Sequence, residues 1–170
     1  MGTRSIITFK NEEGVIQVYK HWDGYPETTV PELQQFLKWN GNRNNDLSYT
    51  MANYCYWHKN MTFEEQKRQH KDQMNKPFYK DFFKGQDTCA HTGLGILPEK
   101  VMNYKQASNE YNAEYFYVID LDQHRIYEEI TEKTWTFTNK RALKTSEGYI
   151  PQAIEVAVKA SNQGRADLVV

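Results

Sequence analysis

The chain has 170 residues, with 21 lysines and arginines, 22 aspartates and glutamates, and a formal net charge of -1. This near balance excludes a protein that attracts nucleic acid through an overall basic field. Aromatic residues make up 14% of the chain, which excludes a disordered chain, because such chains lack the aromatic side chains needed to bury apolar area. The length suits one domain, and we expect residues 1–170 to form a single domain.

The sequence carries no pattern of a signal peptide or a membrane span. Charged residues such as Arg4 and Lys10 interrupt the first 20 positions, and no run of 18 apolar residues occurs. The two cysteines, Cys55 and Cys89, are not spaced as a CxxC pair. We therefore expect a cytoplasmic protein with reduced thiols and no membrane contact.

The first predicted element is a β-hairpin over residues 4–22. Residues 5–9 and 15–19 are rich in β-branched and aromatic side chains, and the turn sequence Asn-Glu-Glu-Gly separates them. The second strand leads into a polar-aromatic turn, His-Trp-Asp-Gly-Tyr-Pro, at residues 21–26. The hairpin thus delivers this turn to the surface.

Helices are predicted after the turn. Pro31 marks the start of a helix over residues 31–39, which Asn-Gly-Asn at residues 40–42 ends. Residues 48–59 place apolar side chains on one helical face. Thr62 and Glu65 match a capping box, which predicts a new, very polar helix to about residue 75. Residues 76–112, interrupted by glycines and prolines, give no clear element.

The C-terminal part predicts a second hairpin. Residues 114–119 and 125–129 read as strands around a turn, residues 134–138 add a further strand, and a final helix begins at Pro151. Two hairpins separated by helices favour an α+β fold with an antiparallel sheet and helices packed on one face.

The candidate site lies at the open end of the first hairpin, because antiparallel pairing brings the start of the first strand beside the end of the second. Arginine offers a planar fork of donors to phosphate, tryptophan gives a flat face for a base, and histidine and tyrosine donate protons. This chemistry suits an anionic, nucleotide-like ligand. The predicted ligand-binding residues are Arg4, Ser5, Lys20, His21, Trp22, Asp23 and Tyr25.

Specific roles follow from these residue types. We expect the cationic residues to hold a phosphate, the aromatic residues to stack on a ring, and Asp23 to orient Arg4 or to accept from a ribose. A binding protein without a cofactor, a metal or catalytic residues is expected, and a homo-oligomer stays open. The alternatives are a phosphodiesterase or other hydrolase with His21 as general acid or base and Asp23 as its orienting group, and a protein-binding inhibitor of a host factor. A purely structural role of the Asp-Gly turn is also open.

The sequence also resembles a known family. Gly-Thr-Arg-Ser at residues 2–5 and the segment 19–26 resemble motifs of small, largely uncharacterised proteins of bacteriophages and prokaryotes, whose members look like GTRS followed by Y-R-x-[WF]-D-G-Y-P. Residues 114–120 echo a later strand of the family, whereas residues 45–112 are unmatched and Lys20 replaces a frequent arginine. The resemblance implies no settled activity. A phage setting implies a protein that counters host defence, for instance by sequestering nucleotide signals.

Two other segments carry weaker signals. Cys89 and His91 precede a Gly-x-Gly and could form a nucleophile with its base or half of a metal site, but a zinc site would need two more ligands. The further candidates are Cys55, His58, His70 and His124. Residues 66–71 form a basic cluster that neighbouring acidic residues dilute, which favours a solvated helix face.

Overall fold

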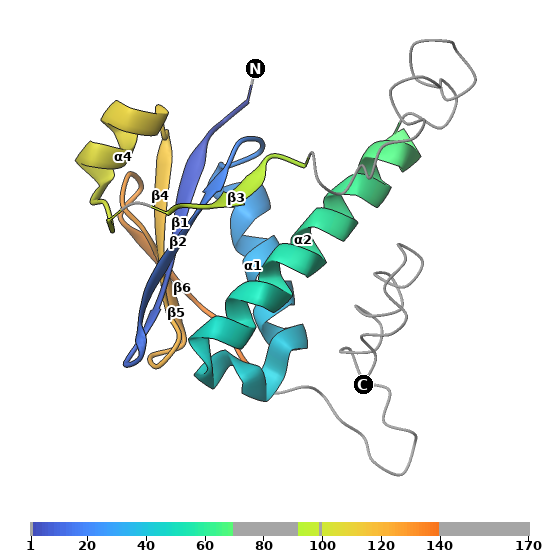
Figure 1. Ribbon diagram of the computed structural model, residues 1–170, viewed down its shortest axis with the longest axis vertical. Helices are drawn as coiled ribbons and strands as arrows, with labels where there is room; N and C mark the ends of the chain where they lie inside the picture. Colours follow the sequence, from blue (N-terminus) through green and yellow to red (C-terminus); the bar gives the residue numbers. More distant parts are fainter. Residues whose placement is uncertain (1, 70–91, 99, 140–170) are drawn as a thin grey trace.

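The protein is an α+β structure built around one six-stranded sheet (Figure 1). The computed structural model describes residues 2–69, 92–98 and 100–139. The strands lie in the order β3-β2-β1-β4-β5-β6. Their bounds are β1 (Ser5–Asn11), β2 (Gly14–Lys20), β3 (Leu94–Ile96), β4 (Tyr115–Asp120), β5 (Arg125–Glu128) and β6 (Lys133–Thr136). The predicted helix from Pro151 lies outside the described residues.

The sheet joins two antiparallel units through one parallel pair. The hairpin β1-β2 and the series β4-β5-β6 are antiparallel, as predicted, whereas β1 and β4 run parallel with Ser5 opposite Tyr115. Parallel neighbours need a long crossover connection, which the helical segment between β2 and β4 supplies. The α+β class with a hairpin at each end is confirmed, and the pairing at its centre makes the sheet mixed.

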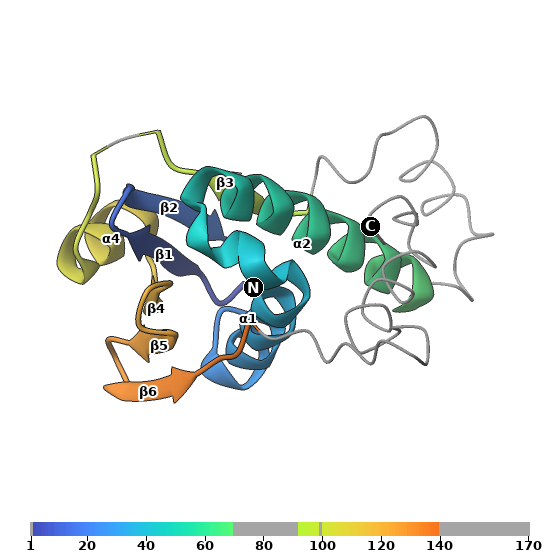
Figure 2. The same ribbon diagram turned by 90° about the horizontal axis from the view of Figure 1, so that it is seen from below.

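Helices lie on both sides of the sheet (Figures 1 and 2). Helix α1 (Pro26–Asn40), the short 3-10 helix η1 (Gly41–Asn45) and helix α2 (Leu47–Gln69) follow the hairpin, and α1 and α2 cover one face. Helix α4 (Tyr104–Tyr111) lies against the other face, which the sequence did not predict. No helix in the described ranges has the length and apolar character needed to cross a bilayer.

Two predicted helix boundaries are wrong. Helix α1 begins at Pro26, where a proline loses no hydrogen bond because the first helical N–H groups have no partner in the helix. Pro31 lies inside the helix with an exposed side chain. Helix α2 runs without a break through Thr62 and Glu65. The Thr62 hydroxyl contacts the His58 ring one turn earlier instead of capping a new helix.

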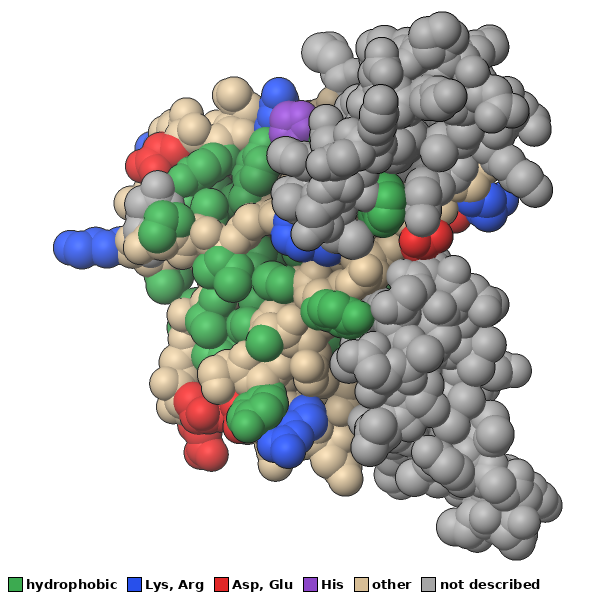
Figure 3. Space-filling model, turned by 45° about the vertical axis from the view of Figure 1, so that its right-hand side comes forward, with side chains coloured by type: hydrophobic (Ala, Val, Ile, Leu, Met, Phe, Trp, Pro, Cys, Tyr) green, Lys and Arg blue, Asp and Glu red, His purple; other side chains and the backbone are tan. Residues whose placement is uncertain are grey.

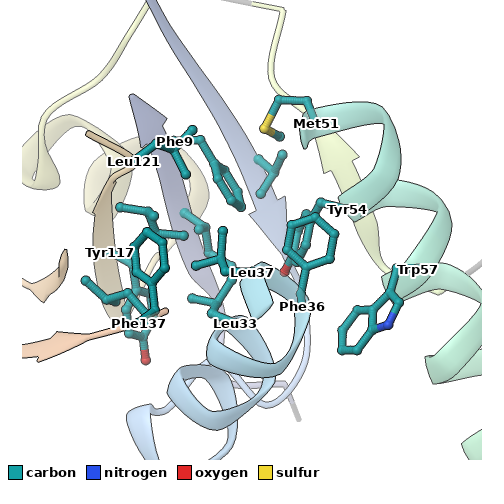
Figure 4. Close-up of a cluster of buried hydrophobic side chains, with 14 of the residues drawn as sticks. Phe9, Leu33, Phe36, Leu37, Met51, Tyr54, Trp57, Tyr117, Leu121 and Phe137 are labelled. Carbon is teal, nitrogen blue, oxygen red and sulfur yellow. The ribbon is translucent and has the colours of Figure 1, made fainter. Parts of the chain in front are cut away.

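The main core fills the space between the sheet and α1 and α2 (Figure 4). Phe9 and Tyr117 of the sheet meet Leu33 and Phe36 of α1 and Tyr54 of α2, and all five are fully buried. The Phe36 and Tyr54 rings meet edge to face with centroids 5.0 Å apart. Each fully buried side chain of this size contributes about 1.5–3 kcal/mol through removal from water. This core fixes α1, and therefore the turn that precedes it, on the sheet.

A second, smaller cluster lies under α4. Ile6 and Phe116 of the sheet pack there against Ala107 and Ala113, with Tyr19 at the margin. Helix α4 begins with a capping box in which Asn103 and Gln106 bond each other's backbone N–H groups. The two faces of β1 and β2 are therefore both covered near the open end of the hairpin.

The surface has no broad basic patch on the face in Figure 3. Lysine and arginine side chains are scattered over this face and lie near acidic ones, around an area of hydrophobic side chains. Arg68 of the predicted basic cluster donates to the Glu65 carboxylate at 3.0 Å. On this face, a ligand with negative charge would thus have to be recognised by a local site.

Candidate functional site

The open end of the hairpin brings together the two segments that the sequence predicted as neighbours. Ser5 of β1 lies opposite Lys20 of β2. Beyond the strands, the Gly24 amide donates to the Thr3 carbonyl at 2.8 Å, and the His21 amide donates to the Gly93 carbonyl beside β3 at 2.9 Å. The turn therefore lies across the start of the chain and is held from both sides.

Glycines in both motifs are required by close packing. A Cβ on Gly24 would lie 2.7 Å from the Thr3 carbonyl oxygen and 2.8 Å from the Ser5 Cβ, and a Cβ on Gly2 would overlap the His21 carbonyl. No side chain fits at either position without moving backbone. This steric role explains part of the two motifs without reference to any ligand.

Strand alternation divides the predicted residues between the two faces of the sheet. Successive side chains in a strand point to opposite faces. Ser5 and Lys20 are paired and buried on the face covered by α1 and α2. Arg4 precedes Ser5, so alternation places it on the opposite face with Ile6, and Tyr19 and His21 share that face. The seven candidates do not form one pocket.

On the face covered by α1 and α2, the buried Lys20 side chain contacts the backbone of the turn. Its Nζ donates to the Asp23 carbonyl at 3.2 Å and to the Thr29 hydroxyl at 3.1 Å, and it lies 3.6 Å from the Glu32 carboxylate. Its side chain is 5% exposed. A ligand at the surface would not reach this ammonium group, so the expected role of Lys20 in holding a phosphate is not supported by its position.

Glu32 links Lys20 to helix α2. Its Oε1 lies 2.8 Å from His58 Nε2, and His58 Nδ1 lies 3.4 Å from the Thr62 hydroxyl. Burial of the Glu32 carboxylate opposes ionisation, but the attraction and hydrogen bonds of His58 and Lys20 outweigh it, so the pKa of Glu32 is lowered. Within the described residues, the buried hydroxyls of Ser5 and Tyr54 have no hydrogen-bond partner.

A tyrosine from β4 completes the support of the turn. The Tyr117 hydroxyl donates to the Gly24 carbonyl at 2.6 Å. Burial raises the pKa of Tyr117 far above its usual value, which keeps this donor protonated. The Asp23 carbonyl also accepts from the Thr29 hydroxyl at 2.9 Å. The backbone of residues 23 and 24 is therefore bonded to the sheet and to α1.

On the face covered by α4, Arg4 precedes β1 and His21 follows β2, at the open end of the hairpin. His21 Nδ1 lies 2.7 Å from the Tyr19 hydroxyl. Arg4 is half-buried, its carbonyl accepts from the Glu114 amide at 2.8 Å, and within the described residues its guanidinium has no carboxylate partner within 4.0 Å. A guanidinium without a carboxylate partner is a local cationic group that can bind an anion.

Trp22 presents a broad aromatic surface beside it. The indole lies against Gly93, whose φ is 76° and where a Cβ would come within 2.5 Å of Trp22 Cζ3. Trp22 is 41% exposed, and its ring meets the His21 ring edge to face at 4.8 Å. Only a glycine allows the indole to lie this close, and the exposed part of Trp22 provides aromatic surface at the protein surface.

Asp23 and Tyr25 form the exposed tip of the turn. The Tyr25 hydroxyl donates to Asp23 Oδ1 at 3.3 Å, and Tyr25 is 36% exposed. Asp23 adopts φ 54°, a left-handed conformation that aspartate tolerates better than most residues. In the described part of the chain its carboxylate bonds neither Arg4 nor His21. The predicted pairing of Asp23 with Arg4 is therefore absent from the geometry.

Several residues of the site were not found from the sequence. Thr29, Glu32, His58 and Tyr117 come from other elements, and no local pattern marks them. Tyr19 carried a usable signal, because it lies in the predicted strand two positions before His21, a spacing that places both side chains on one face of an extended chain.

The weaker sequence signals gain no support. Cys89 and His91 lie outside the described residues. Among the residues described, no three metal-binding side chains come together, and burial raises the pKa of the free Cys55 thiol.

Comparison with known proteins adds no relative. No protein-family model, no curated protein and no solved structure matches this chain. The functional assignment therefore depends on the geometry at the hairpin end.

Proposed function

We propose that the protein binds a small, anionic, nucleotide-like ligand at the open end of the hairpin and does not turn it over. The observation that carries the proposal is the half-buried Arg4, whose guanidinium has no carboxylate partner in the described structure and which lies with His21 at the open end of the hairpin. Arginine binds phosphate oxygens with paired donors. Trp22 offers an exposed indole for a base, with Tyr25 at the rim.

The rigidity of the turn supports binding. Lys20, Thr29 and Tyr117 fix the backbone of the turn from inside, so a ligand would meet preformed groups and lose little free energy to ordering. In this proposal Ser5 and Lys20 support the site from the inner face, and Arg4, His21, Trp22 and Tyr25 contact the ligand.

Sequestration fits the geometry better than hydrolysis. A histidine base is commonly oriented by a carboxylate, whereas His21 is bonded to the Tyr19 hydroxyl and the Asp23 carboxylate accepts from Tyr25. The resemblance to phage proteins gives a biological setting, in which the protein would remove a nucleotide signal of the host defence. This setting is part of the proposal.

Calorimetric titration with a panel of linear and cyclic nucleotides tests the proposal. We expect at least one nucleotide to bind, and Arg4→Gln to weaken its binding by about ten- to a hundredfold, because a charge-assisted hydrogen bond contributes about 1.5–3 kcal/mol. Lys10→Gln is the matched control, since it removes the same charge from the far end of β1, six positions from Arg4. Binding that is equally sensitive to both variants, or no binding at all, would contradict the proposal.

Chromatography of the same mixtures separates a binder from an enzyme. We expect each nucleotide to be recovered unchanged after prolonged incubation. A product that disappears with His21→Ala would establish the hydrolase alternative instead.

A further inference from the structure

A short hydrogen bond joins Tyr19 to His21. The Tyr19 hydroxyl lies 2.7 Å from His21 Nδ1, and the two ring centroids are 5.9 Å apart. Tyr19 lies in β2 and His21 is the first residue after it, two positions on, which is the spacing that brings side chains to the same face of an extended chain. One of the two ring nitrogens of His21 is therefore already engaged within the protein.

Both partners of this bond contact other parts of the protein. The Tyr19 ring lies against the Tyr111 ring of α4 with centroids 5.6 Å apart, and it borders the buried cluster that contains Ile6. The backbone of His21 is fixed by the hydrogen bond from its amide to the Gly93 carbonyl, and its ring meets the Trp22 ring edge to face. Packing therefore restrains the Tyr19 ring directly, and the His21 ring lies between the Tyr19 hydroxyl and the Trp22 indole.

The direction of this hydrogen bond determines what His21 can do. A phenol hydroxyl is a good donor, and a neutral imidazole carries one nitrogen that donates and one that accepts. The hydrogen bond made by one nitrogen sets which nitrogen carries the proton. When the Tyr19 hydroxyl donates to Nδ1, the proton of the neutral ring must reside on Nε2.

We infer that Tyr19 is a positioning residue that holds His21 in the tautomer with its proton on Nε2, so that His21 acts as a hydrogen-bond donor to an anionic oxygen. The inference concerns the same site as the proposed function, and its ligand class rests on that function. A donor at Nε2 complements the Arg4 guanidinium toward a phosphate. The same tautomer leaves no free nitrogen to accept a proton, which disfavours His21 as a general base.

Nitrogen-15 NMR of the histidine rings in the full chain tests the tautomer without any ligand. At alkaline pH, where free imidazole is neutral, we expect the His21 signals of the native protein to show a protonated Nε2. Tyr19→Phe keeps the ring but removes the hydroxyl, and should give a mixture of tautomers. Tyr104→Phe is the control, because Tyr104 borders the same cluster and its ring meets Phe116 rather than His21.

Binding of adenosine monophosphate provides the second measurement. We expect Tyr19→Phe to weaken the affinity for adenosine monophosphate by about three- to tenfold, because the variant lacks the hydrogen bond that positions His21. Tyr104→Phe should leave this affinity unchanged. A proton on Nδ1 in the native protein, or unchanged His21 signals in Tyr19→Phe, overturns the inference. A protonated Nε2 in a protein that binds no nucleotide supports the role of Tyr19 and rejects the proposed function.

Discussion

Replacing Glu32 by glutamine tests whether the buried network below the turn stabilises the fold. The glutamine keeps the shape of the side chain but removes the negative charge that faces Lys20 Nζ at 3.6 Å and His58 Nε2 at 2.8 Å. Lys20, which is 5% exposed, would then be a buried cation without a counter-charge. Removing one partner of a buried ion pair costs about 3–5 kcal/mol.

The expected value lies at the lower end of this range. The separation of 3.6 Å is longer than a direct hydrogen bond, and Lys20 keeps its bonds to the Asp23 carbonyl and the Thr29 hydroxyl. We therefore expect Glu32→Gln to lower the free energy of unfolding by about 3 kcal/mol. In a chain of this length the midpoint of thermal unfolding would fall by about 6–12 °C.

Urea denaturation followed by circular dichroism measures the effect, and a double variant isolates its cause. Lys20→Met combined with Glu32→Gln removes both charges, so it should be more stable than the sum of the single effects predicts, by at least about 1 kcal/mol. Lys10→Met removes the exposed partner of Asp120 and should change the stability by less than about 1 kcal/mol. A Glu32→Gln effect as small as this control, or strictly additive variants, would refute the reasoning.

Three further predictions concern pH, the turn and the second hairpin. The pKa of Glu32 is lowered from 4.5 in the folded protein, so its contribution to stability is fully present above pH 4.5 and is lost as the pH falls through the pKa of the folded state. Lowering the pH should therefore narrow the difference in unfolding free energy between the native protein and Glu32→Gln. Gly93→Ala, which places a Cβ against Trp22 at a φ of 76°, should cost about 1–3 kcal/mol in urea unfolding and weaken nucleotide binding in calorimetry. Glu128→Gln should cost about 3 kcal/mol in the same unfolding assay, because the fully buried carboxylate accepts from the amides of residues 116, 130 and 131 and from the Thr131 hydroxyl. The first prediction is wrong if the stability difference for Glu32→Gln stays constant in acid. The second is wrong if Gly93→Ala binds nucleotide as the native protein does, and the third is wrong if Glu128→Gln leaves the unfolding free energy unchanged.

Local patterns in the sequence predict most of the sheet. Residues 5–9, 15–19 and 114–119 form β1, β2 and β4 because their β-branched and aromatic side chains suit a buried sheet. The parallel pairing of β1 with β4 has no local signal, since it depends on the path of the residues between them. The predicted helix start at Pro31 is wrong because an exposed proline inside a helix and a proline at the first helical position look alike in sequence.

Helix α4 shows a signal that was present but unused. Asn103 and Gln106 form a capping box near the end of residues 76–112, the segment for which the sequence predicts no clear element. An asparagine and a glutamine are weaker sequence markers than the threonine and glutamate of residues 62 and 65, yet the weaker pair forms the box. Whether such a pair caps a helix depends on what the preceding chain does, and here α2 passes through Thr62 uninterrupted.

The proximity of the two hairpin ends was predicted, but the division of their side chains between the two faces of the sheet was not. Antiparallel pairing correctly brings residues 2–5 to residues 20–26. Strand alternation then separates Lys20 from His21, one buried against Glu32 and the other on the face of α4. The inner partners Glu32, His58 and Tyr117 are distant in sequence, so only the folded structure reveals them.

An amide and indole NMR titration of the full chain with adenosine monophosphate tests the central claim most directly, because it locates a ligand rather than only detecting one. We predict saturable shifts at the Arg4 and His21 amides and at the Trp22 indole N–H, and none near Lys10 at the opposite end of β1. Shifts that are absent at saturating nucleotide, or that appear only away from the hairpin end, would contradict the account.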